Sequence, residues 1–157
     1  MSPSDLIHVS VRSAAAEDVP QIVALERAAF SDPWSGRTFL ALLDRDEVLF
    51  DVAVLGDPEG SEVAGYSVVY LMGVEADLAN IAVNATVRRG GVGRLLLRHL
   101  LTTARVRGVR EMFLEVRQSN EGARTMYENE GFVEVGRRAK YYVHPVEDAL
   151  ILRRSLW

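Results

Sequence analysis

Apolar and polar residues alternate along several short segments of the chain, which is the pattern of a strand with one buried face. In "REMFLEVRQSN" the alternation sets Met112, Leu114 and Val116 on one face and Glu115 on the other. Two apolar segments flank the turn "GDPEGS" (56–61) and therefore indicate a hairpin. The predicted strands are residues 6–12, 47–55, 62–72, 74–86, 110–120, 132–138 and 148–156.

Other segments repeat their apolar residues at intervals of three and four, as one face of a helix does. Asn120 is a good N-cap residue, and Gly108 and Gly131 are typical of helix ends. The apolar faces are Ile22, Val23, Leu25, Ala29 and Phe30 in one helix and Val92, Leu95, Leu96, Leu100 and Ala104 in another. The predicted helices are residues 15–30, 36–46, 92–107 and 120–131.

The predicted elements follow the order β-α-α-β-β-β-α-β-α-β-β, which indicates a mixed sheet flanked by helices. A chain of 157 residues suits one domain with a core large enough to be stable alone. We therefore expect a single mixed α/β domain over residues 1–157.

Composition excludes several classes of protein. Hydrophobic residues make up 48% and charged residues 25% of the chain, a balance that argues against disorder. No apolar run approaches the ~18–20 residues of a membrane span, and the first residues do not resemble a signal peptide, so we expect a cytoplasmic protein that does not enter a membrane. The net charge of −4 disfavours general binding of nucleic acid and suits a cationic partner.

Cysteine is absent from the chain, which excludes disulfides, thiolate metal sites and an acyl-cysteine intermediate. The three histidines, His8, His99 and His144, are widely spaced, so no metal site is expected. A G-x-S-x-G motif, the mark of many serine hydrolases, is also missing.

The segment "VRRGGVGR" (87–94) joins a predicted strand to a predicted helix. Glycine in a helical turn costs ~1 kcal/mol relative to alanine, so three glycines at a helix start need a reason. Free amides at a helix N-terminus bind anions, glycines let a phosphate approach them, and arginines add charged contacts. The patterns of Mg-nucleotide and dinucleotide loops are absent or incomplete, which leaves a pyrophosphate bound without magnesium. Taken alone, the segment fits a tight turn with solvated arginines equally well.

The same segment resembles the pyrophosphate-binding loop of the GCN5-related N-acetyltransferases (GNAT), R/Q-x-x-G-x-G/A. "SNEGARTMYENEGF" is similar to a second segment of that family, N-x-x-A-x-x-x-Y-x-x-x-G-F, and the order of elements also agrees. The resemblance implies a mostly antiparallel sheet of about seven strands with four helices. It also implies acetyl-CoA as cosubstrate, beside a strand that splays from its neighbour. The residues that it assigns to acetyl-CoA are Ile81, Ala82, Val83, Arg88, Arg89, Gly90, Gly91, Val92, Gly93, Arg94 and Asn120.

Within the family, several stretches resemble the ribosomal protein alanine N-acetyltransferases. They are "DPWS", "NIAV", "LEVRQSN", "MYENEGF", "RRAKYY" and "EDALIL". The chain departs from that type after Tyr142, where "VHPV" stands in place of a longer insertion that helps to shape the peptide groove. This resemblance implies a protein substrate with a free N-terminus, a small-subunit ribosomal protein that begins with alanine.

Acetyl transfer to an amine needs a neutral amine, a polarised thioester carbonyl and a proton for the departing thiolate. An α-amino group has a pKa near ~8 and a lysine side chain one near ~10.4, so the α-amine of a peptide is deprotonated more easily at pH 7. The resemblance implies Glu115 as the base, acting directly or through water, and Tyr127 as the general acid. By residue type alone, Glu115 would be an exposed strand acid and Tyr127 a packing residue.

The acceptor site is expected to include acidic, aromatic and basic side chains. Tyr141 and Tyr142 are adjacent on a strand, so their side chains should point to opposite faces and only one should line the groove. The predicted substrate-binding residues are Trp34, Glu75, Asp77, Arg138, Tyr141, Tyr142 and Glu147.

Three other functions stay open at this point. The acceptor could be protein lysine, a polyamine or an amino sugar, although small-molecule enzymes are expected to lack "LEVR", "YY" and "EDA". An acyl-CoA-binding sensor or scaffold would need neither Glu115 nor Tyr127. A nucleic-acid module is disfavoured because the arginines are scattered among acids.

Overall fold

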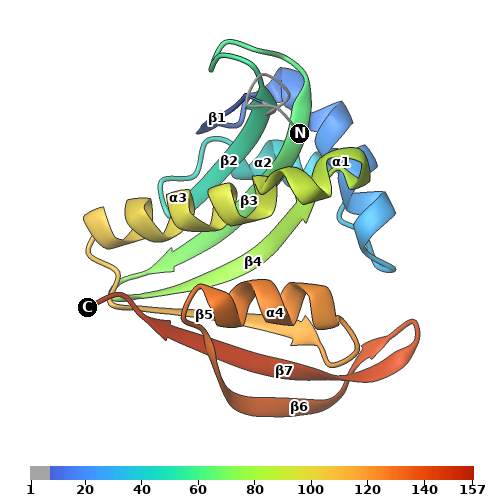
Figure 1. The fold of residues 1–157 in the computed structure, drawn as a ribbon, viewed down its shortest axis with the longest axis vertical. Coiled ribbons are helices and arrows are strands. Elements are labelled where there is room, and N and C mark those ends of the chain that lie inside the picture. Colours follow the sequence, from blue (N-terminus) through green and yellow to red (C-terminus); the bar gives the residue numbers. More distant parts are fainter. Residues whose placement is uncertain (1–7) are drawn as a thin grey trace.

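The computed structural model describes residues 8–157, apart from the side chains of residues 88–90, and its strands form one seven-stranded sheet in the order β1-β2-β3-β4-β5-β7-β6 (Figure 1). Residues 6 and 7 of the first predicted strand lie outside the described residues. The strands are β1 Val9–Ser13, β2 Val48–Leu55, β3 Val63–Met72, β4 Glu75–Val83, β5 Glu111–Arg117, β6 Val133–Val143 and β7 Val146–Ser155. The helices are α1 Val19–Ala29, α2 Gly36–Leu42, α3 Val92–Val106 and α4 Glu121–Asn129, with short 3-10 turns η2 Ala16–Asp18 and η3 Ala85–Gly90.

The parallel pair of β4 and β5 joins two antiparallel parts of the sheet. β1 to β4 pair in sequence, and β7 pairs between β5 and β6. The parallel pairing extends only from Glu75 opposite Glu111 to Leu78 opposite Leu114. Figure 1 shows the two strands side by side at the left and parted towards the right. The predicted mixed, mostly antiparallel sheet with four helices is confirmed.

The helices cover both faces of the sheet. In Figure 1, α3 and α4 lie in front of the sheet and α1 and α2 lie behind it. The front core includes Leu97 and Leu100 of α3, and the rear core includes Ile22 of α1 and Phe39 of α2. Leu95 is 40% exposed, because the buried stripe of α3 runs through its neighbours instead. That part of the predicted apolar face is therefore wrong.

The hairpin of β6 and β7 is longer than the sequence predicts. β6 continues to Val143, five residues beyond the predicted end at residue 138. β7 begins at Val146, before the predicted start at residue 148. The pairing of β6 with β7 is irregular between Arg138 and Tyr142, and Lys140 adopts a left-handed φ of 52°. The Lys140 amide donates to Asp148 Oδ1 at 3.0 Å, which holds this bulge in place.

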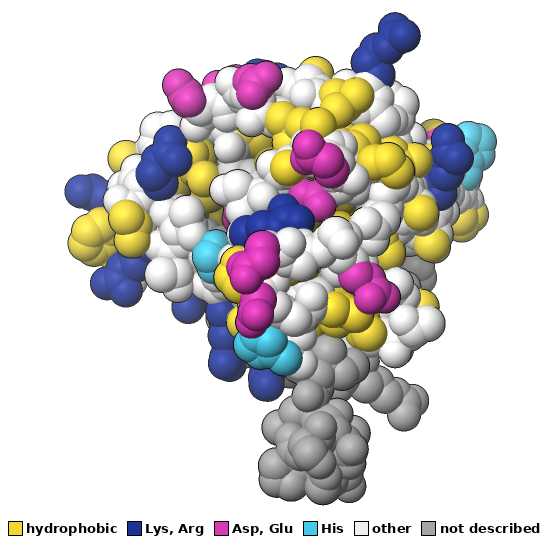
Figure 2. All heavy atoms as spheres, turned by 90° about the horizontal axis from the view of Figure 1, so that it is seen from above, with side chains coloured by type: hydrophobic (Ala, Val, Ile, Leu, Met, Phe, Trp, Pro, Cys, Tyr) yellow, Lys and Arg dark blue, Asp and Glu magenta, His cyan; other side chains and the backbone are white. Residues whose placement is uncertain are grey.

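The described surface carries mixed charge. Figure 2 shows acidic, basic and apolar side chains interspersed on the face seen from the top of Figure 1, so neither sign of charge dominates there. Among the described helices, none is both long and apolar enough to cross a membrane.

Candidate active site

A cleft of about 830 Å³ opens where β4 and β5 separate. Its walls come from the end of α1 and the segment after it, from both parted strands, from α4 and from the β6–β7 hairpin. The residues that line it are Glu26, Ala29, Phe30, Ser31, Asp32, Trp34, Tyr70, Asp77, Leu78, Ala79, Asn80, Ile81, Glu115, Val116, Arg117, Asn120, Ala123, Tyr127, Arg138, Tyr141, Tyr142 and Val143.

One edge of β4 borders this cleft without a strand beside it. β4 pairs with β3 as far as Val83, whereas its described pairing with β5 ends at Leu78. The peptide groups of residues 79–83 on that edge are consequently available to a ligand with amide groups of its own. The structure thus places the predicted residues Ile81, Ala82 and Val83 on the edge that leads away from the parting strands.

A β-bulge turns the side chains of β4 at the same point. Leu78 lies opposite Val69 of β3 and Asn80 lies opposite Val68, so β4 has one extra residue, Ala79. Leu78 belongs to the front core, but Asn80 contacts Glu26 of α1 behind the sheet. The bulge therefore aims Asn80 at α1 while it bends the strand at the cleft.

The predicted pyrophosphate loop precedes α3. The chain passes through η3 and then through Gly91, which caps α3 with a left-handed φ of 77°. The first backbone bond of the helix runs from the Leu95 amide to the Gly91 carbonyl, at 3.0 Å. The amides of Val92, Gly93 and Arg94 come before it, at the positive end of the helix dipole, where a phosphate is favoured.

The glycines of this loop have different physical roles. Gly91 has open space around a Cβ, so its requirement is the left-handed backbone. A Cβ on Gly93 would lie 3.0 Å from Met126 Sδ, so this glycine lets α3 and α4 approach each other. Val92 is buried in the core and can offer only its amide to a ligand. Gly90 ends the 3-10 turn η3, and the side chains of Arg88 and Arg89 lie outside the described part of the structure.

Two carboxylates face each other across the parting strands, Glu115 on β5 and Asp77 on β4. Glu115 Oε1 lies 2.9 Å from Arg138 Nε in an ion pair, and the Glu115 side chain is 24% exposed. Burial raises the pKa of Asp77, the charge of Glu115 raises it further, and Arg138 opposes both. The pKa of Tyr141 is also raised, first by its hydrogen bond to Glu115. The site thus couples two acids, one guanidinium and one phenol.

Tyr127 of α4 reaches the same cleft from the front core. Its side chain is buried, and its ring meets Phe132 edge-on, with the centroids 5.8 Å apart. Burial and the neighbouring Tyr142 raise the pKa of Tyr127, so its hydroxyl keeps its proton at neutral pH. Asn120, also in the cleft wall, caps α4 as predicted, because its Oδ1 accepts the Ala123 amide at 3.2 Å.

Both Tyr141 and Tyr142 line the cleft, and the expectation that only one would do so is wrong. Simple alternation fails because Tyr141 lies inside the irregular stretch between Arg138 and Tyr142, next to the left-handed Lys140. The two rings meet edge-on with their centroids 5.1 Å apart. Burial, followed by the charge of Glu115, raises the pKa of Tyr142 to about 12.

Two predicted substrate residues lie outside the cleft lining. Glu75 is exposed at the start of β4, two residues before Asp77 and opposite Glu111, where the strands are still paired. Glu147 accepts the Ser119 amide at 2.6 Å and Arg117 Nη1 at 3.2 Å, and these bonds keep its pKa low, those of Ser119 above all. It supports the wall from behind. The remaining predicted residues, Trp34 and Arg138, do line the cleft.

Two further residues line the cleft, Glu26 and Arg117, and no motif of the sequence singles them out. Glu26 occupies a helix position beside predicted core residues, yet its side chain is only 1% exposed and belongs to the cleft wall. By spacing, Arg117 is only a strand residue that could pair with Glu115, whereas the structure gives it partners in two loops. The place of Glu26 beside Leu25, on the edge of the predicted apolar face, is the only sequence feature that could have indicated its burial.

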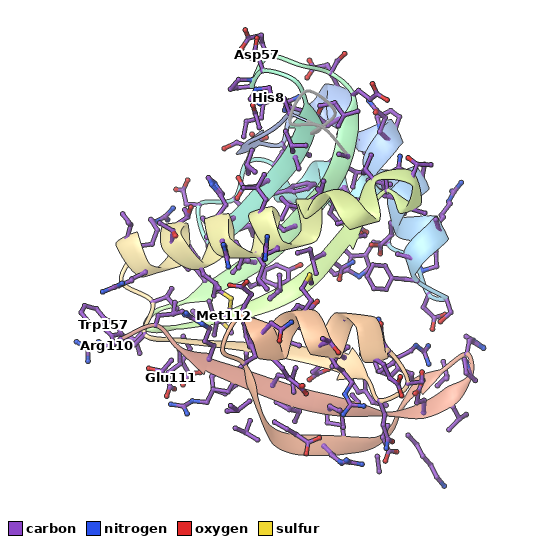
Figure 3. All side chains as sticks on the ribbon, in the orientation of Figure 1. His8, Asp57, Arg110, Glu111, Met112 and Trp157 are labelled. Carbon is purple, nitrogen blue, oxygen red and sulfur yellow. The ribbon has the colours of Figure 1, made fainter. Side chains whose placement is uncertain are left out.

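A second hollow lies at the other end of the sheet and shares no residue with the cleft. It is lined by Val74, Arg110, Glu111, Ser155 and Trp157, and Figure 3 labels three of these at the end where β4 and β5 are paired. The guanidinium of Arg110 lies 5.6 Å from the centre of the Trp157 ring. The one acidic side chain among the described residues of this hollow, Glu111, is paired with Arg153.

Comparison with known proteins assigns the chain to a family. Residues 19–132 match the model of the acetyltransferase (GNAT) family. The chain therefore belongs to the GNAT acetyltransferases, and the family suggested by its motifs is confirmed.

Several relatives carry the name ribosomal protein bS18-alanine N-acetyltransferase. The protein of that name from Salmonella typhimurium is 36% identical over 137 residues, which cover 86% of this chain and 89% of the relative. The one from Escherichia coli K12 is 34% identical over 145 residues, or 91% and 95% of the two chains. The crystal structure of the Escherichia coli ribosomal-protein-S18-alanine N-acetyltransferase superposes with a TM-score of 0.83 at 33% identity, covering 95% of this chain and 94% of the other.

The left-handed turn at Gly91 gives a test of the pyrophosphate site. Gly91→Ala places a side chain on a left-handed residue, which costs roughly 1–2 kcal/mol and shifts the amides that follow. We expect the Kd of acetyl-CoA, measured by calorimetry, to rise about tenfold, the equivalent of 1.4 kcal/mol.

Gly108→Ala is the matched control. Gly108 also has a positive φ, 91°, and open space around a Cβ, but it follows the other end of α3. It should lower the melting temperature about as much and leave the Kd unchanged. Equal effects of the two variants on the Kd would contradict a cofactor role for the Gly91 turn.

Proposed function

We propose that this protein transfers the acetyl group of acetyl-CoA to the α-amine of an N-terminal alanine on a ribosomal protein, bS18 in the names of its relatives. The observation that carries the proposal is the pair of acids, Asp77 and Glu115, in the opening between β4 and β5. A cationic N-terminus is attracted to two acids, and one of them takes up its proton. Relatives of that name cover most of this chain, which supports the same acceptor.

The structure fits acetyl-CoA at two separate features. The amides of Val92, Gly93 and Arg94 would hold the pyrophosphate, and the free edge of residues 79–83 would pair with the amides of the pantetheine arm. When bound there, acetyl-CoA supplies an acetyl group activated as a thioester. Among the described residues, no group of His, Cys, Asp and Glu is arranged to hold a metal ion, and the proposed chemistry uses none.

Glu115 is the proposed base. Its carboxylate takes the proton from the incoming amine, directly or through a water molecule, as the amine attacks. Arg138 and Tyr141 hold the carboxylate from one side. Burial and the charge of Glu115 raise the pKa of Asp77. Asp77 is the second acid that would face the positively charged amine of the acceptor.

Tyr127 is the proposed general acid. The departing sulfur needs a proton, and the hydroxyl of Tyr127, which lines the cleft and is protonated at neutral pH like any phenol, can donate one. Amine and thioester react directly when both are held in the cleft, so proximity supplies much of the rate. Neither step needs a cysteine or an activated serine.

The acceptor is tested with free CoA as the readout. A basic peptide that begins with alanine should release CoA from acetyl-CoA, because its α-amine loses its proton at a pKa near ~8. The same peptide with a blocked N-terminus and free lysines should release none. Release from both peptides would instead support lysine as the acceptor. Binding of acetyl-CoA with no release from either would contradict the proposal.

The base is tested with Glu115→Gln. The amide keeps the shape of the side chain but cannot take up a proton, so we expect kcat to fall by about 10²–10⁴ with the Kd of acetyl-CoA unchanged. Glu111→Gln is the control on the same strand, at the end where β4 and β5 are paired. It should leave kcat within about twofold. An unchanged kcat in Glu115→Gln across the pH range would remove this residue from the mechanism.

A further inference from the structure

The segment between α1 and α2 forms one wall of the cleft. Phe30, Ser31, Asp32 and Trp34 all line the cavity, and we call residues 30–35 the wall segment. Its two ends continue the helices, since the Phe30 amide donates to the Glu26 carbonyl and the Ser35 carbonyl accepts the Phe39 amide, but residues 31–34 between them make no backbone–backbone hydrogen bond within the described part of the chain. Its position must therefore come from side chains of other elements.

Glu26 fixes one end of the wall segment. Its Oε2 accepts the Trp34 amide at 2.7 Å, and its Oε1 accepts Asn80 Nδ2 at 2.7 Å and the Tyr66 hydroxyl. Asn80 Nδ2 also lies 3.0 Å from Oε2. A carboxylate that is 1% exposed is stable only when such donors replace the lost water, and here every donor comes from a different element.

The same carboxylate joins the wall to the strand proposed for acetyl-CoA. Asn80 is turned towards Glu26 by the bulge at Ala79, and the next residue, Ile81, lies on the free edge of β4. Tyr66 lies in the adjacent strand β3 and is fully buried. The wall segment is thus tied through one side chain to the part of β4 that borders the cofactor site.

Arg117 fixes the other end of the wall segment. Its Nη2 donates to Ser31 Oγ at 2.8 Å and to the His144 carbonyl at 3.2 Å. Its Nη1 donates to the Pro145 carbonyl at 3.0 Å and to Glu147. The guanidinium also stacks on Tyr142, 4.2 Å from the ring centre. The planar guanidinium of Arg117 therefore links the wall segment to the tip of the β6–β7 hairpin.

We propose that Glu26 and Arg117 are positioning residues for the acceptor peptide, which hold the wall segment and the hairpin tip at the correct separation. The inference rests on the proposed function for the identity of the acceptor. Neither residue takes part in proton transfer. Their loss changes where the peptide binds while Glu115, Tyr127 and the turn at Gly91 remain in place.

The substitution Glu26→Gln tests the first residue. Whichever way the amide turns, its NH₂ group opposes at least one donor, either the Trp34 amide or the Asn80 side chain. We expect the KM of an alanine peptide to rise about tenfold or more, with kcat and the Kd of acetyl-CoA within about twofold. Arg117→Lys keeps the positive charge but loses the planar guanidinium with its several donors. The same result is expected, a raised peptide KM with kcat and the Kd of acetyl-CoA nearly unchanged.

Two control variants separate positioning from general destabilisation. Asp18→Asn removes a carboxylate that is 3% exposed and bonded to Arg12 and to the Ala15 amide, at the other end of α1. Arg98→Lys changes an arginine that pairs with Glu130 on the surface. Both should leave the peptide KM unchanged, even where Asp18→Asn lowers the melting temperature.

A second measurement does not depend on activity. Hydrogen exchange of the Trp34 amide should be slow in the wild type and about tenfold or more faster in Glu26→Gln, with no such change in Asp18→Asn. The inference would be overturned if exchange of the Trp34 amide were unchanged in Glu26→Gln. It would also be overturned if Glu26→Gln and Arg117→Lys both had the peptide KM of the wild type. If the wild type exchanges as expected but acetylates no peptide, the proposed function fails while the positioning of the wall segment stands.

Discussion

The short parallel pairing of β4 and β5 is the constraint on which the site depends. Four residue pairs, from Glu75–Glu111 to Leu78–Leu114, hold the two halves of the sheet together. Beyond them the strands diverge, and one edge of β4 is left free in the interior of the protein. A longer parallel pair would close the cleft and cover the edge proposed for acetyl-CoA. A shorter one would leave the halves joined mainly through helices.

The charged groups in and beside the cleft fall into two sets. Asp77, Glu115 and Arg138 remain partly open to the cavity, where a cationic amine can reach them. Glu26 and Glu147 have their oxygens occupied by donors from the protein. Such carboxylates hold loops in place because an unsatisfied buried charge is costly. The proposed base and the carboxylates that hold loops are thus the same residue type, and only their surroundings distinguish them.

Much of the fold could be predicted from the sequence, because the periodicities in this chain are regular. The alternation of Met112, Leu114 and Val116 located β5, and residue type alone gave Asn120 its capping role. The failures lie where tertiary contacts override a local pattern. The bulge at Lys140 placed both tyrosines in the cleft, and the donors around Glu26 allowed a carboxylate to be buried on a helix. Neither the bulge nor the donors around Glu26 can be read from the spacing of residues.

The most direct test of the account is a crystal structure of this protein with CoA and a peptide that begins with alanine. The account predicts the pantetheine arm along residues 79–83, the pyrophosphate at the amides of Val92 to Arg94, and the peptide α-amine between Asp77 and Glu115. A pantetheine arm bound elsewhere, such as the hollow beside Trp157, would contradict it. A peptide N-terminus outside the opening between β4 and β5 would contradict it as well.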